Sequence, residues 1–212
     1  LGNSMLIPVL PILEKKVGIS SFQSSLIITS YSVASILLIP IAGYLSDRYG
    51  RKMILLPSLI ITFIGGLISA FASWKMDNPF MVIIVGRIIQ GIGSAGAFPI
   101  ILPLVGDLFK DDDKASSVLG IVETSNTFGK VLSPIIGAAL AISLWFLPFF
   151  AISLLSAITF FMILFCIKVP KKTEEPPTLK EFLQDTKKIF KKEGKWLSAI
   201  FITGAFVMLI LF

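Results

Sequence analysis

Long apolar runs alternate with short polar interruptions along this chain. Residues 26–41 and 53–71 are almost wholly apolar, and a compact cluster of charges lies between them. A run of about 20 apolar residues is the length of a helix that crosses the hydrocarbon core of a bilayer. The pattern predicts an all-α integral membrane protein, with complete spans at residues 22–45, 53–73, 80–104, 118–141 and 144–167.

The two ends of the chain are read as incomplete spans. Residues 1–13 are apolar but too short to cross a membrane, so we expect them to be the outer end of a first span whose beginning is missing. Residues 1–167 would then form a six-helix N-terminal transmembrane bundle. Residues 196–212 would be the truncated start of a seventh span, which belongs to a C-terminal half.

Residues 168–195 are the one long hydrophilic stretch, with nine lysines and five acidic residues. We expect a cytoplasmic linker between the two halves. Apolar residues recur there at helical spacing, which predicts an amphipathic helix. These residues are Leu179, Phe182, Leu183, Ile189 and Phe190.

Composition agrees with a membrane protein and narrows its chemistry. The chain is 55% hydrophobic with a mean hydropathy of +0.89, which is outside the range of a soluble domain. Its one cysteine, Cys166, has no partner for a disulfide, and the absence of histidine excludes histidine metal sites. No nucleophile–base set or phosphate-binding loop is visible, so we expect neither an enzyme nor a cofactor.

The distribution of positive charge predicts the orientation. Of nineteen Lys and Arg, fourteen lie in the loops between spans 2 and 3, 4 and 5, and 6 and 7, three lie in the other loops, and Arg87 and Lys130 are inside spans. The positive-inside rule places the loops between spans 2 and 3, 4 and 5, and 6 and 7 in the cytoplasm of a multi-pass cell-membrane protein. Because these cations separate apolar runs, they indicate topology in a lipid bilayer and not a nucleic-acid-binding face.

The charged turn at residues 43–52 reads GYLSDRYGRK, and Gly50 in it is free to adopt a positive φ. The pattern G-x-L-x-D-R-x-G-R-K closely resembles the signature of the major facilitator superfamily between its second and third spans. The resemblance implies two six-helix halves that alternate between inward-open and outward-open states. It also implies a cytoplasmic gate that latches the halves, formed by Gly43, Asp47, Arg48, Gly50, Arg51 and Lys52.

Three further segments resemble motifs of the twelve-span drug/proton antiporters in that superfamily. Residues 1–11 resemble the first-span motif, and residues 87–96 (RIIQGIGSAG) the fourth-span motif R-x-x-x-G. Residues 129–138 (GKVLSPIIGA) resemble the fifth-span antiporter motif, although Ser133 and Ala138 replace glycines.

Gly129, Ser133 and Gly137 recur every four residues, which predicts a stripe where another helix approaches closely. The resemblance implies that this helix belongs to the missing C-terminal half. Pro134 would kink the span or loosen its hydrogen-bond ladder.

Charges inside the predicted spans need a partner or a water-filled cavity, because each costs about 2.5–3.5 kcal/mol at the bilayer centre. In the fifth span Glu123, Asn126 and Lys130 share one helix face, which predicts a cavity wall. The alternative is an ion pair that only fixes packing, although seven residues separate Glu123 and Lys130 by about 10.5 Å along the axis.

Arg87, Gln90 and Ser94 share a face of the fourth span in the same way, which predicts a second cavity wall. Two roles for Arg87 stay open. It would anchor helices by donating to backbone carbonyls of the first span, or, as the resemblance implies, take part in proton transfer.

The resemblance implies a secondary active transporter, which we expect to perform proton-coupled efflux of small amphipathic molecules or drugs. Its partners would be a small-molecule substrate, protons and the C-terminal half. Lys130 leaves open an exporter or importer of a specific, anionic metabolite. An alternative of another class is a membrane scaffold that transports nothing, against which the polar stripes argue.

Overall fold

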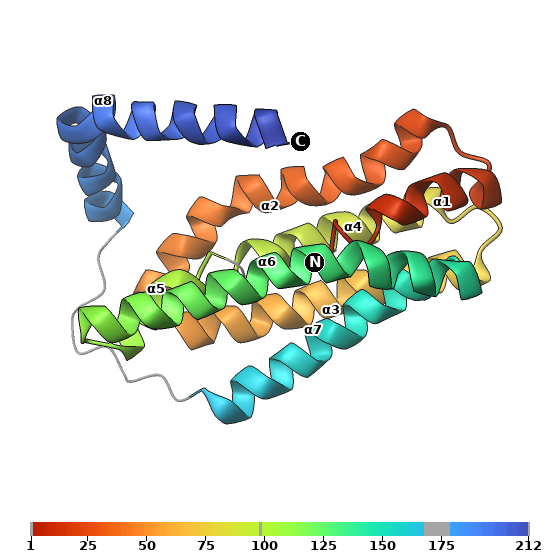
Figure 1. Cartoon of the computed structure of the whole chain (residues 1–212), viewed down its shortest axis with the longest axis horizontal. Coiled ribbons are helices and arrows are strands. Elements are labelled where there is room, and N and C mark those ends of the chain that lie inside the picture. The colour runs from red at the N-terminus through yellow and green to blue at the C-terminus, as the bar shows by residue number, and fades with distance from the viewer. Residues whose placement is uncertain (1, 98, 168–178, 212) are drawn as a thin grey trace. The chain divides into compact units, whose positions relative to one another are not determined.

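The computed structural model describes residues 2–97, 99–167 and 179–211, which form two compact units, Leu1–Thr173 and Glu174–Phe212. Residues 168–178 of the predicted linker lie outside the described residues. Every regular element that the structure describes is a helix (Figure 1), which confirms the all-α class. The first unit contains η1 (Ile7–Val9), α1 (Leu10–Val17), α2 (Ser21–Tyr49), α3 (Arg51–Lys75), α4 (Phe80–Ala95), α5 (Ile101–Leu108), α6 (Asp112–Ser143) and α7 (Leu147–Cys166), and the second contains α8 (Leu179–Leu211).

Three of the described helices, α2, α3 and α7, are long and apolar enough to cross a membrane. The 16-residue α4 is apolar but shorter, and α6 is long but carries Glu123, Lys130 and several other polar residues. The lengths and composition of the three long helices agree with the predicted membrane class.

The predicted fourth span, residues 80–104, is not one continuous helix. α4 ends at Ala95 and α5 begins at Ile101. Pro99 lies in the interruption, lacks an N–H group and disfavours helical backbone in the residue before it, while Gly96 ends α4 without a side chain. The predicted fourth span thus contains two helices, and its position in the membrane stays a prediction.

The start of the chain packs into the bundle that α2, α3, α4 and α7 form. Close helix approach depends on small residues, and a Cβ added at Gly86 of α4 would lie 2.7 Å from the carbonyl oxygen of Gly65 in α3. The core near the start of the chain includes Met5, Leu6, Leu13, Ile27, Ile83, Phe149 and Ile152.

The 32-residue α6 is buried mainly in its C-terminal half. Its buried residues are Ser133, Gly137 and Ala141, all in its C-terminal half, and it runs unbroken through Pro134. A Cβ at Gly137 would lie 2.1 Å from the carbonyl oxygen of Met5, so the N-terminal segment of this chain makes a close approach to the predicted stripe. An approach by the C-terminal half stays a prediction.

Candidate functional site

Arg87 is the centre of a buried polar cluster that joins three segments. The residue is 0% exposed, and its Nε donates to the carbonyl oxygen of Ile27 in α2 at 3.1 Å. Its two terminal nitrogens donate to Oε1 of Gln90 on α4 and to Oδ1 of Asn3. The amide of Asn3 donates in turn to Ser32 Oγ on α2 at 3.0 Å.

The charge of Arg87 meets neutral acceptors and an aromatic ring. Its guanidinium carbon lies 4.4 Å from the ring centre of Tyr31, a cation–π distance. None of the ion pairs among the described residues includes Arg87. A carbonyl does anchor Arg87, but it belongs to α2 and not to the first span, whereas a role in proton transfer stays a prediction.

The polar face of α4 lies against α2 in this half and is not open. Gln90 is 1% exposed, and Ser94 Oγ donates to Ser35 Oγ of α2 at 3.0 Å. Asn3 was not recognised from the sequence. A large amide inside the apolar first 13 residues was the signal that could have pointed to it.

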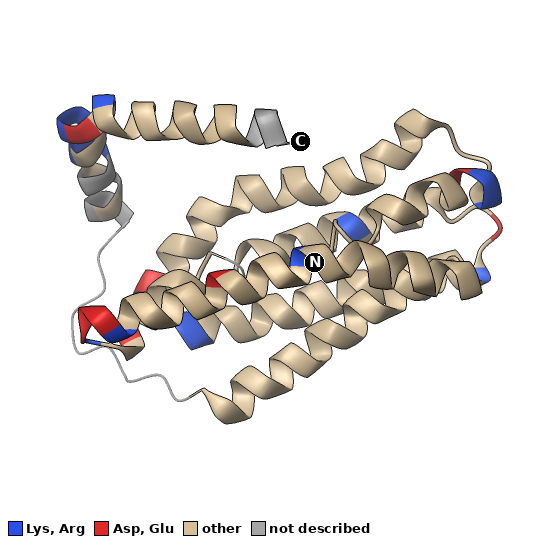
Figure 2. Cartoon of the chain, viewed as in Figure 1, with Lys and Arg blue, Asp and Glu red and all other residues tan. Residues whose placement is uncertain are grey.

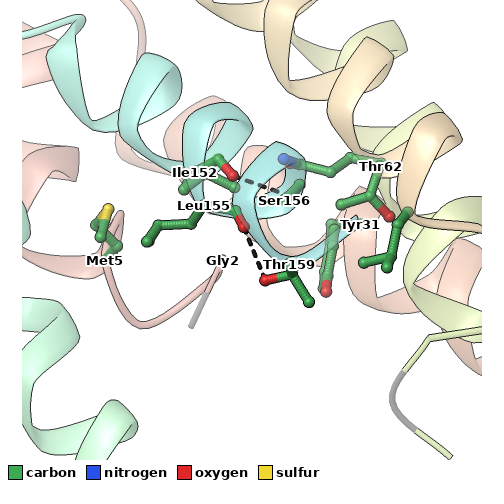
Figure 3. A pocket seen from close by; sticks show the side chains of 10 residues that line it. Gly2, Met5, Tyr31, Thr62, Ile152, Leu155, Ser156 and Thr159 are labelled. Carbon is green, nitrogen blue, oxygen red and sulfur yellow. Dashed lines mark hydrogen bonds between the residues drawn. The ribbon is translucent and has the colours of Figure 1, made fainter. Parts of the chain in front are cut away.

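A small cavity of about 130 Å³ adjoins this cluster (Figure 3). Tyr31, Thr62 and Gln90 line it, together with Ser156 and Thr159 of α7, whose hydroxyls donate to carbonyls of their own helix. Sites for drug-sized ligands have volumes of about 300–1,000 Å³. This cavity is therefore too small for such a substrate.

Arg51 bridges the ends of two helices in the predicted gate. Its Nη1 lies 2.5 Å from Oδ1 of Asp47 and donates to Ser46 Oγ at 2.8 Å. Its Nε donates to Oδ2 of Asp107 at the end of α5, at 3.0 Å. The arginine side chain is 11% exposed and each carboxylate about one-third exposed, so the pairs are partly shielded from solvent.

Asp107 was missed because its partner is 56 residues away in the sequence. The usable signal was an acidic residue at the end of an apolar run, on the same predicted side of the membrane as the charged turn.

The other cations of the gate have separate partners. Arg48 donates to the hydroxyl of Tyr44 at 2.8 Å, so the ion pair of Asp47 is with Arg51. Lys52 donates to the carbonyls of Leu164 (2.9 Å) and Ile167 (2.6 Å) and thereby caps the C-terminus of α7.

The glycines of the gate differ. Gly50 has φ +99° and ψ 145°, so the positive φ is present, although outside the left-handed helical region. A Cβ at Gly43 would have nothing within 4 Å, so no contact among the described residues requires a glycine there.

Among the described residues, the charged face of α6 makes only local hydrogen bonds. The amide of Asn126 donates to both carboxylate oxygens of Glu123 at 3.2 and 3.4 Å. Glu123 and Lys130 are exposed, and no ion pair among the described residues joins them. Figure 2 shows few charged positions along α6, whose other charged residues, Asp112, Asp113 and Lys114, lie in its first turn.

A family model described as Major Facilitator Superfamily matches residues 1–212. The chain belongs to the major facilitator superfamily. This confirms the resemblance drawn from the turn at residues 43–52. It also confirms the predicted transporter fold and the expectation that the chain is not an enzyme.

Three curated relatives are transport or resistance proteins. The bacillibactin exporter of Bacillus subtilis (strain 168) is 57% identical over the whole chain, which covers 53% of that protein. A triacylglyceride transporter of Mycolicibacterium smegmatis is 34% identical over 73% of the chain and 27% of its own length. The quinolone resistance protein NorA of Staphylococcus aureus is 27% identical over 82% of the chain and 43% of its own length. The chain thus spans about half the length of these relatives or less.

Proposed function

We propose that this chain is the N-terminal half of a secondary active exporter that moves a small amphipathic molecule outward in exchange for protons. The exposed Glu123–Asn126–Lys130 face of α6 carries the proposal, because two charges in a predicted span need a wet cavity or a ligand. Membership in the superfamily supports alternating access between two halves, with the substrate bound near the membrane centre.

The three clusters have different roles in this proposal. The Arg87 cluster fixes α4, α2 and the start of the chain as one rigid wall. Glu123 is the carboxylate for which a proton and the substrate compete. The Asp47–Arg51–Asp107 network is the cytoplasmic latch that is broken and remade in each cycle.

A second candidate is an exporter dedicated to one compound. The relative at 57% identity is named for bacillibactin, whereas the relative named for drug resistance is 27% identical. An exposed Lys130 on the α6 face would attract an anionic group of such a compound. We propose bacillibactin, or a molecule of similar chemistry, as the first substrate to test.

Uptake into inverted vesicles that contain the full-length protein tests both candidates. A proton gradient, acidic inside, should drive accumulation of bacillibactin, of ethidium, or of both, and an uncoupler should abolish it. Accumulation of ethidium supports a drug exporter, and of bacillibactin alone a dedicated one. If neither accumulates above vesicles without the protein, the export proposal is wrong for these substrates and the scaffold alternative gains support.

The proposed orientation has a separate test. With Cys166→Ser as background, Lys114→Cys should resist an impermeant thiol reagent added to intact cells, whereas Asn78→Cys should react. Both side chains are exposed, so access depends on the side of the membrane. Reaction at position 114 but not 78 would reverse the orientation.

A further inference from the structure

α8 carries basic and apolar residues on different sides of one helix. It runs unbroken from Leu179 to Leu211, out of the predicted linker and into the predicted seventh span. At about 100° per residue, its lysines at 187, 188, 191, 192 and 195 fall within about 140° of the circumference. Ile189, Phe190 and Trp196 lie on the remaining arc and are 54%, 64% and 67% exposed.

Among the described residues of this segment, no carboxylate lies on the lysine side of the helix. Glu193 lies about 100° beyond the edge of the lysine arc. The side chains of Lys187, Lys191, Lys192 and Lys195 are exposed, and the ion pairs of the described residues include none of them. Four ammonium groups are therefore available to an external anion.

We propose that this segment of α8, residues 187–196, binds the anionic phospholipid headgroups of the membrane surface. Clustered lysines next to a membrane-spanning helix are attracted to the anionic headgroups of the cytoplasmic leaflet. Ile189 and Phe190 would enter the boundary between headgroups and acyl chains, while the lysine ammonium groups reach the phosphates.

The shape of α8 suits such a position. Its ribbon changes direction sharply (Figure 1), and Figure 2 shows that this bend lies among the charged positions, beyond which the helix is uncharged. The charged part can therefore lie along the membrane surface while the uncharged part enters the bilayer. The exposed apolar residues of the same segment favour a lipid surface over a soluble anion, which would leave them in water.

This inference is independent of the substrate and of proton coupling. If the proposal holds, residues 187–196 attach the linker to the surface of one membrane leaflet. The two halves of the transporter would then move relative to that attachment.

A fluorescent reporter in the full-length protein tests the proposal. Ile189→Cys, with the other cysteines replaced, is labelled with bimane, and the protein is placed in vesicles of phosphatidylcholine alone or with one-quarter phosphatidylglycerol. Nitroxide-labelled lipid should quench the bimane more strongly in the anionic vesicles. Because salt screens charges in the interface, 0.5 M NaCl should reduce the difference.

Replacement of Lys187, Lys191, Lys192 and Lys195 by Gln should lower the ratio of docked to undocked segment about 100-fold or more. The matched control removes four lysines elsewhere, at positions 15, 16, 110 and 114, and should leave quenching unchanged. The four corresponding Lys→Arg substitutions keep the charge and should retain the preference for anionic lipid. This variant keeps the proposal testable if the Gln variant folds poorly.

Three outcomes would overturn the proposal. The first is equal quenching in neutral and anionic vesicles, and the second is an anionic preference that persists in the Gln variant or disappears in the Arg variant. The third is a response in neutral vesicles to 10 mM inorganic phosphate, which would assign the lysines to a free anion.

Discussion

The Arg87 cluster and the charged face of α6 both place ionisable groups in predicted membrane spans, but only the first satisfies them internally. Arg87 is fully buried and donates to an α2 carbonyl and to two side-chain amides. Glu123 and Lys130 are exposed, and Glu123 bonds only a neighbour three residues away. A charged group whose hydrogen-bond partners lie in the same bundle contributes to the packing of that bundle. A charged group without such partners needs water, a ligand or another part of the protein to stabilise it in the membrane.

α6 itself shows the same division along its length. Its C-terminal half is packed through Ser133 and Gly137, and the latter touches Met5. Its N-terminal half has no buried residue and includes the exposed Glu123. The packed end can thus hold the helix in place while the open end faces a cavity in the proposed transporter.

Loss of Arg87 should have the largest effect on stability. Arg87→Ala leaves the Asn3 side-chain oxygen without its donor and removes one donor of the Ile27 carbonyl, which still accepts from Ser30 Oγ. It also opens a cavity at a fully buried side chain, so it should lower the free energy of unfolding by about 3–5 kcal/mol. Unfolding of the purified protein in detergent measures the loss. Lys130→Ala is the control, with an expected change within about 0.5 kcal/mol. Equal losses for the two variants would remove the distinction between the two regions.

Glycines on the two ends of α6 should respond in opposite directions to one substitution. Gly137→Ala places a methyl group 2.1 Å from the Met5 carbonyl oxygen and should destabilise by about 1–3 kcal/mol. Gly120→Ala has nothing within 4 Å and should stabilise the helix by about 0.5–1 kcal/mol. The same unfolding measurement compares the two variants. If Gly137→Ala left the free energy of unfolding unchanged, the Met5 backbone would be able to move away from α6 without loss of stability.

Features that depend on neighbouring residues in the chain were predicted better from the sequence than contacts between distant residues. Apolar runs placed the long helices, and helical spacing put Glu123 and Asn126 together, because both depend on neighbours in the chain. Asn3 and Asp107 were missed because they meet Arg87 and Arg51 across 84 and 56 residues, and no local periodicity encodes such partners.

The interruption between α4 and α5 was not anticipated from the sequence for another reason. Residues 80–104 are nearly all apolar, and apolar content alone cannot distinguish a continuous helix from one that Gly96 and Pro99 interrupt.

The gate network should affect transport much more than stability. Asp47→Asn keeps the shape of the side chain but removes one of the two carboxylates that contact Arg51, and partly exposed pairs contribute about 1 kcal/mol or less. We expect a sharp fall in vesicle uptake at nearly normal expression, and the same for Asp107→Asn. Lys110→Gln is the control. Unchanged uptake in both Asn variants would reduce the turn to a topology signal.

Glu123→Gln should have the smallest effect on stability and a decisive effect on coupling. Glutamine is isosteric and preserves a hydrogen bond with Asn126, and the site is exposed, so the free energy of unfolding should change by less than about 0.5 kcal/mol. The variant cannot exchange a proton at position 123, so uptake driven by a proton gradient should stop. Exchange of labelled for unlabelled substrate, which needs no net proton movement, should continue. Thr124→Ala, one residue along on the same exposed half of α6, controls for disturbance of the helix. A Gln variant that still concentrates substrate with an unchanged pH dependence would make Glu123 structural, and the coupling carboxylate would then belong to the C-terminal half.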